Sequence, residues 1–303
     1  MEVEKAFLGN RETVRRVLMV LLAGGHVLLE DIPGVGKTTL ATAFSKVLDL
    51  HCNRIQFTPD IMPSDITGFT MLRKGTHALE YKPGAAMCNL LLADEINRAS
   101  ARSQSALLEA MEENAVTVDG ITHMLPQPFM VIATQNPFGS SGTQLLPDSQ
   151  MDRFMMCLSI GYPEEQDELE LLRRKHGNYD MEPIVRITDA AGLADMRRDV
   201  AGIYIHRNIY AYMIRLVRAT RTHELIARGA SPRCSVALAA LAQAAAYISG
   251  RDFVIPEDIQ EVFAGCAAHR LTLSPQAKQQ KKSAKDILMD ILHSVKAPVL
   301  RER

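Results

Sequence analysis

The chain has almost no net charge, because 34 basic and 35 acidic side chains among its 303 residues sum to −1. A dedicated nucleic-acid-binding protein usually carries a strong basic field, so the composition argues against that class while leaving room for a local basic patch. Its 18 glycines and 14 prolines are too few for a collagen-like or low-complexity chain, and 47% apolar residues exclude a disordered one. We expect a globular protein with two domains or one large domain.

Closely spaced cysteines and long apolar runs are also missing. The five cysteines never occur as Cys-x-x-Cys and the nine histidines show no ligand spacing, so neither a disulfide framework nor a zinc cluster is predicted. The longest uncharged stretch, Cys234 to Gly250, is shorter than the roughly 20 residues that span a bilayer. The first residues mix both charge signs, unlike a secretory signal. These features predict a cytoplasmic protein without a membrane segment.

The first half of the chain alternates short apolar runs with helical patterns. Because the central runs are nearly continuously apolar, they favour parallel strands buried on both faces. Helical patterns between them predict an α/β fold, with a glycine-rich loop between the first strand and its helix. The predicted strands span residues 26–30, 54–58, 89–94, 129–135 and 154–160, and the helices span 13–23, 38–48 and 103–113.

The character of the sequence changes after Gly161-Tyr162-Pro163, and few strand signals follow. Helical patterns predominate from there to the end, where a lysine- and glutamine-rich stretch precedes a last helix. We therefore predict a parallel-sheet α/β domain over residues 1–162 and a smaller all-α domain over 163–303. The predicted helices of the second domain span residues 164–177, 208–221, 235–248 and 256–271.

The segment Asp31 to Thr38 (DIPGVGKT) matches a phosphate-binding loop in all but its first glycine, where Asp31 stands. Gly34 and Gly36 allow backbone N–H groups to approach phosphate oxygens, Lys37 supplies a positive charge, and Thr38 offers a hydroxyl to Mg²⁺. An ordinary strand-to-helix turn is the alternative, but the flanking strand and helix fall where a phosphate loop needs them. The predicted nucleotide-binding residues are Pro33, Gly34, Val35, Gly36, Lys37, Thr38 and Thr39.

A second acidic motif, NLLLADE, ends the apolar run at Asp94 and Glu95. Asp94 at the strand end is suited to hold Mg²⁺ together with Thr38, and Glu95 is suited to polarise a water in line with the γ-phosphate. Two solvated acids at the end of a strand are the alternative. The phosphate loop upstream favours the catalytic interpretation and predicts ATP and Mg²⁺ as ligands.

With these motifs in place, most of the chain resembles the MoxR group of the AAA+ ATPases. The similarity is strongest from Gly24 to Pro163 and covers, in order, GGHVLLEDIPGVGKTTLA, QFTPDIMPSDITG, NLLLADEINRA, QSALLEAMEE, VTVDG, VIATQNP, LPDSQMDRF and GYP. It implies a P-loop AAA+ core over residues 1–162 followed by an all-helical lid domain over 163–303. It also implies a ring assembly, most simply a hexamer.

The resemblance suggests roles that the residues alone leave open. Asn136 resembles sensor 1, which places the attacking water, Arg153 resembles an arginine finger for the neighbouring subunit, and Arg233 resembles sensor 2 on the lid. The alternatives are a turn asparagine before Pro137, a surface ion pair for Arg153, and a first-turn helix arginine for Arg233. The predicted catalytic residues are Lys37, Glu95, Asn136, Arg153 and Arg233.

The sequence also departs from the family pattern. Residues 138–145 replace the usual acidic, tyrosine-containing loop, and Asp148, Ser149 and Met151 stand where other residues are usual. Residues 7–10 occupy the place of an adenine contact, with a short match. Residues 68–87 resemble a helix-2 insert and residues 116–125 a hairpin before the sensor strand. Their candidate partner contacts are Leu72, Arg73, Lys74 and Tyr81, with simple solvated hairpins as the alternative.

The favoured hypothesis is a ring-forming, Mg²⁺-dependent ATPase that acts as a chaperone-like remodeller. The family suggests a von Willebrand A-domain partner and an outcome such as complex maturation or metal insertion. A nucleic-acid motor is one alternative, which the absence of a basic-aromatic stripe disfavours. The other is a scaffold that binds ATP with little turnover, which the intact Glu95, Asn136 and Arg153 disfavour.

Overall fold

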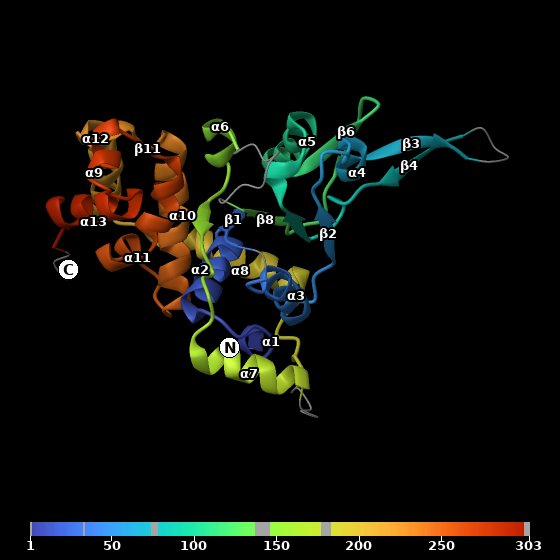
Figure 1. The fold of residues 1–303 in the computed structure, drawn as a ribbon, viewed down its shortest axis with the longest axis horizontal. Helices are drawn as coiled ribbons and strands as arrows, with labels where there is room; N and C mark the ends of the chain where they lie inside the picture. The colour runs from blue at the N-terminus through green and yellow to red at the C-terminus, as the bar shows by residue number, and fades with distance from the viewer. Residues whose placement is uncertain (1, 33, 74–77, 137–145, 177–182, 300–303) are drawn as a thin grey trace. The chain divides into compact units, whose positions relative to one another are not determined.

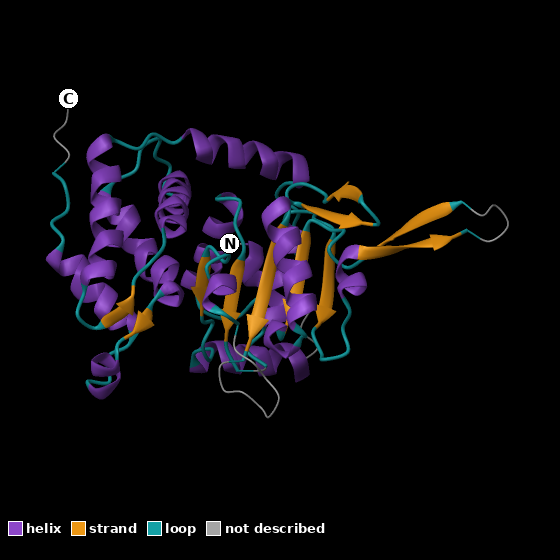
Figure 2. Ribbon diagram, turned by 90° about the horizontal axis from the view of Figure 1, so that it is seen from above, coloured by secondary structure: helices purple, strands orange, loops and turns teal. Residues whose placement is uncertain are grey.

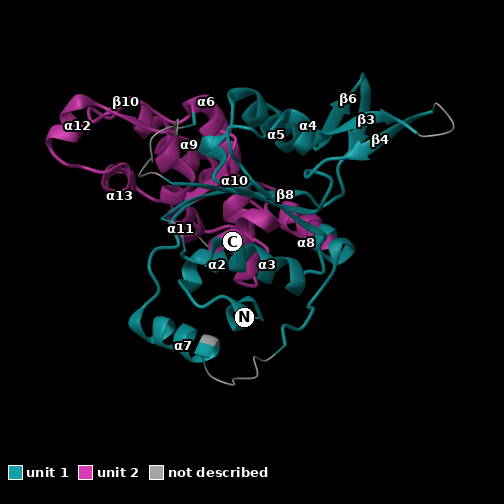
Figure 3. Ribbon diagram, turned by 45° about the vertical axis from the view of Figure 1, so that its right-hand side comes forward, with its two compact units in different colours: residues 1–15, 26–146, 158–194 teal, residues 16–25, 147–157, 195–303 magenta. Residues whose placement is uncertain are grey.

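The computed structural model describes residues 2–32, 34–73, 78–136, 146–176 and 183–299. The chain forms two compact units (Figure 3). Unit 1 comprises residues 1–15, 26–146 and 158–194, and unit 2 comprises residues 16–25, 147–157 and 195–303. The units interleave along the sequence, whereas the predicted domain boundary is a single cut near residue 162, which stays a prediction.

The main sheet has five strands in the order β2-β5-β8-β1-β9. Figure 2 shows the strands of this sheet lying side by side. The β1–β8, β2–β5 and β5–β8 pairs are parallel, as the apolar runs predict. All six residues of β8 and the first four of β5 are buried, so both strands are covered on both faces. The strands are β1 (Val27–Glu30), β2 (Cys52–Gln56), β5 (Leu90–Asp94), β8 (Met130–Gln135) and β9 (Met156–Leu158).

The parallel pairing brings the carboxyl ends of several strands to one edge of the sheet. Glu30 lies opposite Gln135 in the β1–β8 register, and Gln56 lies opposite Asp94 in the β2–β5 register. Open α/β sheets bind ligands at this edge, outside the carboxyl ends of their strands. Residues that follow β1, β5 and β8, including Glu95, are therefore placed around one location.

Helices flank the sheet, and two hairpins are inserted in its sequence, one after edge strand β2 and the other between inner strands β5 and β8. The β3–β4 hairpin extends away from the rest of unit 1 (Figure 1). Its strands, β3 (Gly68–Leu72) and β4 (Leu79–Pro83), are antiparallel, as are β6 (Ala115–Val118) and β7 (Ile121–Met124). The helices of unit 1 are α1 (Glu2–Ala6), α3 (Lys37–Val47), α4 (Pro63–Thr67), η1 (Ile96–Arg98), α5 (Ala101–Glu113) and α7 (Glu165–His176); α2 (Arg11–Leu22) and α8 (Ala190–Gly202) each run from one unit into the other.

Unit 2 is mainly helical, as predicted for the second half of the chain, and alanine-rich α10 packs against α11 and α9. It also contains a two-stranded sheet of β10 (Ile226–Arg228) and β11 (Thr272–Leu273), which the helical patterns do not indicate. None of the helices in the described ranges has both the length and the hydropathy that crossing a bilayer requires. The helices of unit 2 are α6 (Asp148–Met151), α9 (Arg207–Thr222), α10 (Pro232–Ile248), α11 (Pro256–Ala267), η2 (Ala268–Arg270), α12 (Pro275–Gln279) and α13 (Ala284–Ser294).

Candidate functional site

A cavity of about 410 Å³ lies in unit 1, where the strands β1, β5 and β8 end. Most of its lining is polar, and basic and acidic side chains face the same space. Eight of the residues predicted from the sequence line it together, although they come from three separate segments. The lining residues are Asp31, Gly34, Gly36, Lys37, Thr38, Thr39, Arg54, Gln56, Asp94, Glu95 and Asn136.

The loop between β1 and α3 has the backbone conformation that a phosphate loop needs. Gly34 and Gly36 have φ values of 92° and 89°, in the left-handed region that side chains with a Cβ rarely adopt. Helix α3 begins at Lys37, directly after Gly36, so its N–H groups at the first turn point out of the helix end. That end favours anions such as phosphate. Val35 belongs to the same loop, and Pro33 lies outside the described residues.

Lys37 lies at the mouth of this loop and already contacts its backbone. Its Nζ donates to the carbonyl oxygen of Asp31 at 2.6 Å. Burial lowers the pKa of Lys37, and the carboxylates of Asp31, Asp94 and Glu95 oppose that shift. A phosphate group in the cavity would add further negative charge and so favour the ammonium form.

Asp31 explains why the first glycine of the pattern is absent here. Its buried carboxylate accepts hydrogen bonds from Ser159 Oγ at 2.8 Å, Ile160 N at 2.5 Å and Gly161 N at 3.2 Å. The side chain therefore ties the start of the phosphate loop to the segment after β9. A glycine at position 31 would leave these two backbone N–H groups without that acceptor.

We expect Asp31→Gly, which restores the usual glycine, to destabilise the fold by about 2 to 4 kcal/mol, because hydrogen bonds to a buried charged acceptor are lost. Urea unfolding of the purified variant measures this. Asp31→Asn keeps one acceptor oxygen and should lose less, and Asp60→Ala, at an exposed position, serves as the control. An Asp31→Gly protein as stable as the parent chain would contradict this role.

The acidic pair at the end of β5 is held by Thr134 of the neighbouring strand β8. The Thr134 hydroxyl donates to Asp94 Oδ1 at 2.6 Å and accepts from the backbone N of Glu95 at 2.9 Å. Glu95 adopts a left-handed conformation with φ 56°, which is uncommon for a residue other than glycine. One buried hydroxyl thus fixes both the carboxylate of Asp94 and the turn that presents Glu95 to the cavity.

Two arginines neutralise these acids. Arg54 on β2 donates from Nη2 to Asp94 Oδ2 at 2.8 Å and to Gln56 Oε1 at 3.3 Å, and it lines the cavity. Arg98 on η1 donates from Nη1 to Glu95 Oε2 at 2.8 Å. The motifs do not single out Arg54 or Thr134, because neither lies in the phosphate loop or in the acidic motif. Each is a polar residue on a strand, and only the strand register shows that it reaches Asp94.

The remaining predicted residues fall in different places. Asn136 follows β8 directly and lines the cavity, as expected for a polar residue at a strand end. Arg153 and Arg233 belong to unit 2, where Arg153 is half-buried after α6 and Arg233 is exposed in the first turn of α10. Their roles stay predictions.

The predicted partner contacts in residues 68–87 and the predicted adenine contact in residues 7–10 differ in how exposed they are. Leu72 is 59% exposed and Arg73 is exposed, but the Tyr81 hydroxyl donates to Thr67 O at 2.5 Å and its ring stacks on His123 at 3.8 Å. Tyr81 therefore joins the two hairpins of unit 1. Phe7 is buried, and its ring packs against the phosphate loop so closely that a Cβ added at Gly36 would lie 3.2 Å from it. Lys74 and the segment 138–145 lie outside the described residues.

Comparison with known proteins identifies the family. Residues 26–156 match the model of the ATPase family associated with various cellular activities (AAA), and residues 218–291 match that of the AAA lid domain. The chain is 45% identical to the uncharacterised protein YeaC of Bacillus subtilis, covering 99% of this chain and 93% of that protein. It is 39% identical to Chaperone MoxR1 of Mycobacterium tuberculosis, with coverage of 98% and 81%.

A solved structure agrees with the sequence comparisons. The crystal structure of a Cytophaga hutchinsonii protein, provisionally described as an ATPase, matches with a TM-score of 0.91 at 37% identity, over 98% of this chain and 93% of that one. The cavity described above combines the phosphate loop with the acidic motif that such enzymes need for nucleotide chemistry. The chain therefore belongs to the MoxR group of the AAA ATPases, which hydrolyse ATP.

Proposed function

We propose that this protein is a Mg²⁺-dependent, ring-forming ATPase that remodels protein complexes as a chaperone. The observation that carries the proposal is the single cavity that gathers Lys37, Thr38, Asp94, Glu95 and Asn136. A structural turn or a pair of solvated acids would not place these five side chains around one space. The name of the Mycobacterium tuberculosis relative, Chaperone MoxR1, supports the chaperone part.

The residues present suit magnesium. Thr38 and Asp94 offer hydroxyl and carboxylate oxygens to the same cavity, and Mg²⁺ binds through oxygen ligands of this kind together with substrate phosphates. Bound Mg²⁺ would supply neutralisation of the phosphate charge. Thr134 donates to one carboxylate oxygen of Asp94, and Arg54 donates to the other.

The chain's own groups then account for hydrolysis. In the proposed mechanism Lys37 and the loop N–H groups bind the β- and γ-phosphates of ATP, and Asn136 orients a water molecule. The Glu95 carboxylate accepts a proton from that water as it attacks the γ-phosphorus in line with the leaving oxygen. Arg98, which contacts Glu95 at 2.8 Å, holds the carboxylate in the cavity until the water is in place.

We infer that Arg54 competes with the metal for Asp94. Arg54→Ala removes one cation from the carboxylate, so we expect half-maximal nucleotide binding at a two- to fivefold lower Mg²⁺ concentration, as for a half-exposed pair worth about 0.5 to 1 kcal/mol. Titrating Mg²⁺ against a fluorescent ATP analogue measures it. Arg186→Ala, which removes an arginine of similar exposure that pairs with Asp49 and Asp189 outside the cavity, is the control. An unchanged or higher Mg²⁺ requirement would contradict the competition.

Several finer points are part of the same proposal. The functional division is an ATPase core over residues 1–162 and a lid over 163–303. Arg233, on the lid, acts as sensor 2 and contacts the bound nucleotide. Arg153 completes the site of a neighbouring subunit in the ring. None of the five cysteines takes part in a disulfide, which supports a reducing, cytoplasmic location. The partner is a von Willebrand A-domain protein, and the outcome is complex maturation or metal insertion.

A trapping experiment tests the partner. Glu95→Gln is expected to hold ATP without cleaving it and so to retain a von Willebrand A-domain protein in a pull-down. Lys37→Ala, which loses its phosphate contact, should retain none under the same conditions. Equal recovery by both variants, or the absence of any such domain among the retained proteins, would argue against this partner.

A further inference from the structure

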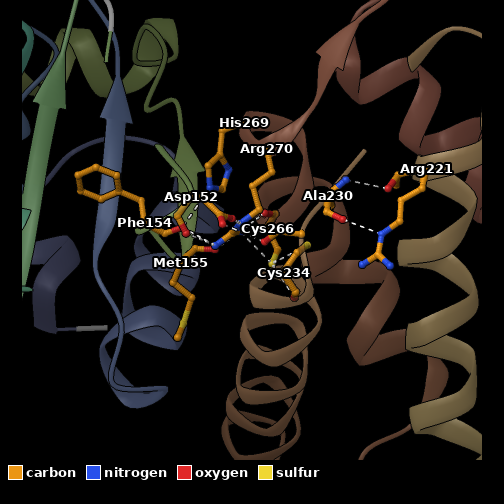
Figure 4. A network of polar contacts seen from close by, with 11 residues as sticks. Asp152, Phe154, Met155, Arg221, Ala230, Cys234, Cys266, His269 and Arg270 are labelled. Atoms are coloured by element: carbon orange, nitrogen blue, oxygen red, sulfur yellow. Dashed lines mark hydrogen bonds and ion pairs between the residues drawn. The ribbon is translucent and has the colours of Figure 1, made fainter. Parts of the chain in front are cut away.

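Two buried thiols face each other where α10 and α11 pack together in unit 2 (Figure 4). Cys234, in the first turn of α10, and Cys266, in the last turn of α11, are each 0% exposed, and both are free. Their Sγ atoms lie 3.9 Å apart, close enough for one thiol to hydrogen bond to the other. A disulfide needs about 2.05 Å between the sulfurs, so moderate adjustment of the two helix ends would join them.

A buried arginine lies against this thiol pair. Arg270 on η2, whose side chain is 2% exposed, donates from Nη1 to Cys266 Sγ at 3.4 Å. The hydrogen bond from Cys234 and the charge of Arg270 lower the pKa of the Cys266 thiol, while the same hydrogen bond and burial raise that of Cys234. The two sulfurs are therefore unequal, and Cys266 is the stronger candidate for a thiolate.

The same arginine holds the segment that precedes β9. Its Nε donates to Asp152 Oδ1 at 2.7 Å, and its Nη2 donates to the carbonyl oxygen of Phe154 at 2.7 Å. Ser231, next to α10, donates to the other oxygen of Asp152 at 2.9 Å. Burial lowers the pKa of neighbouring His269 to about 3, so that ring stays neutral and adds no positive charge beside the sulfurs. Arg270 is thus the shared contact of the thiols and the 152–154 segment.

We propose that Cys234 and Cys266 are a redox-active dithiol that a hydroperoxide converts into a disulfide, and that this change alters the hold of Arg270 on the 152–154 segment. The effect on activity rests on the proposed function, because Arg153 lies within that segment and Arg233 adjoins Cys234. Both sulfurs are buried, so the oxidant is a small hydroperoxide rather than a bulky disulfide such as oxidised glutathione.

The chemistry balances as a two-electron oxidation. The Cys266 thiolate attacks the peroxide oxygen, the O–O bond breaks, and the leaving hydroxide takes up a proton to become water. Cys234 Sγ then attacks the sulfenic sulfur of Cys266 as its own proton is lost. The S–O bond breaks, and hydroxide leaves as a second water. Two thiols and one hydrogen peroxide thus give one disulfide and two waters.

Formation of the bond changes the sulfur that Arg270 contacts and draws α10 towards α11. The guanidinium of Arg270 is a rigid plane that donates to Cys266, Asp152 and Phe154. A shift of the Cys266 sulfur would therefore change the geometry of its hydrogen bonds to Asp152 and Phe154. We therefore expect the oxidised protein to hydrolyse ATP severalfold more slowly, and a thiol reductant to restore the rate.

Peptide mapping after peroxide treatment tests the site directly. The folded protein is treated with hydrogen peroxide or with oxidised glutathione, its free thiols are alkylated, and the disulfide-linked peptides are identified by mass spectrometry. We expect a Cys234–Cys266 link with peroxide, little link with glutathione, and reversal by dithiothreitol. Cys52 and Cys157, which are half-buried, serve as internal controls.

Two single variants identify the attacking sulfur. With Cys234→Ala, a dimedone-type reagent should label Cys266 as its sulfenic acid, because the resolving thiol is gone. With Cys266→Ala, Cys234 should stay unlabelled. The peptide mapping uses the unmodified protein, so its result holds even if one of these variants fails to fold.

Three results would overturn the proposal: no Cys234–Cys266 link at peroxide levels that oxidise Cys52 or Cys157, links formed only between other cysteines, or a complete link with an unchanged hydrolysis rate. A reduced protein that hydrolyses no ATP would instead count against the proposed function, since the mapping still reports the disulfide.

Discussion

Glu95→Gln is expected to lower steady-state ATP hydrolysis by about 10³-fold, which is within the range for removal of a general base. Glutamine keeps the size of the side chain and an oxygen that can accept from Arg98, which lies 2.8 Å from Glu95, but it cannot take up a proton from water. The phosphate contacts of Lys37 and the loop are untouched. Nucleotide affinity should therefore stay near that of the parent protein.

Phosphate release and ATP binding, measured on the same preparation, separate the two effects. Glu109→Gln on α5 is the matched control, because Glu109 is exposed and lies outside the cavity. It should leave both measurements unchanged. Loss of binding together with hydrolysis would show that Glu95 supports the fold of the site rather than the chemistry. Unchanged hydrolysis would remove Glu95 from the mechanism.

Arg153→Ala is expected to lower hydrolysis by at least about 10³-fold, the effect of losing an arginine finger, while ATP still binds. The reason is that Arg153 is proposed to reach the γ-phosphate of a neighbouring subunit and to stabilise charge in the transition state. Arg153→Lys should recover only part of the rate, because lysine lacks the planar fork of arginine. Arg198→Ala, at a well exposed ion pair in unit 2, is the control.

Mixing two inactive proteins tests action between subunits. A subunit with Arg153→Ala keeps its Glu95, and a neighbour with Glu95→Gln can supply the missing arginine. In a random equal mixture about one quarter of the sites would be complete, so we expect about one quarter of the parent activity if the sites act independently. No recovery on mixing, with both variants assembled into rings, would show that Arg153 does not act across subunits.

The candidate site residues that can be identified from the sequence lie in continuous motifs. Gly34, Lys37 and Thr38 share one loop, and a strand-to-helix turn of that composition has few other uses. Asp94 and Glu95 end an apolar run whose pattern predicts a buried parallel strand. Parallel strands end at the same edge of the sheet, which brings these segments together, and in the structure they line one cavity.

The residues that were missed depend on contacts between distant segments. Arg54 becomes part of the site only because the β2–β5 register sets Gln56 opposite Asp94. Thr134 reaches Asp94 because β8 pairs with β5. No spacing within either strand indicates these pairings, so both residues look like ordinary polar positions on a strand until the register is known.

The roles of Asp31, Cys234 and Cys266 also depend on contacts between distant segments. Asp31 is a mismatch in the loop pattern, yet its carboxylate binds backbone N–H groups of Ile160 and Gly161. Cys234 and Cys266 carry no sequence signal, since they are far from any Cys-x-x-Cys spacing. Packing of α10 against α11 alone brings their sulfurs to 3.9 Å.

A single-turnover assay on the unmodified protein tests the central claim most directly. Protein in excess over γ-labelled ATP binds the nucleotide, Mg²⁺ is added, and the reaction is stopped at intervals to separate bound ATP from released phosphate. We predict that bound ATP is cleaved when Mg²⁺ is present and stays intact when a chelator replaces it. Bound ATP that stays uncleaved with Mg²⁺, in protein assembled into rings, would contradict an ATPase and favour a nucleotide-binding scaffold.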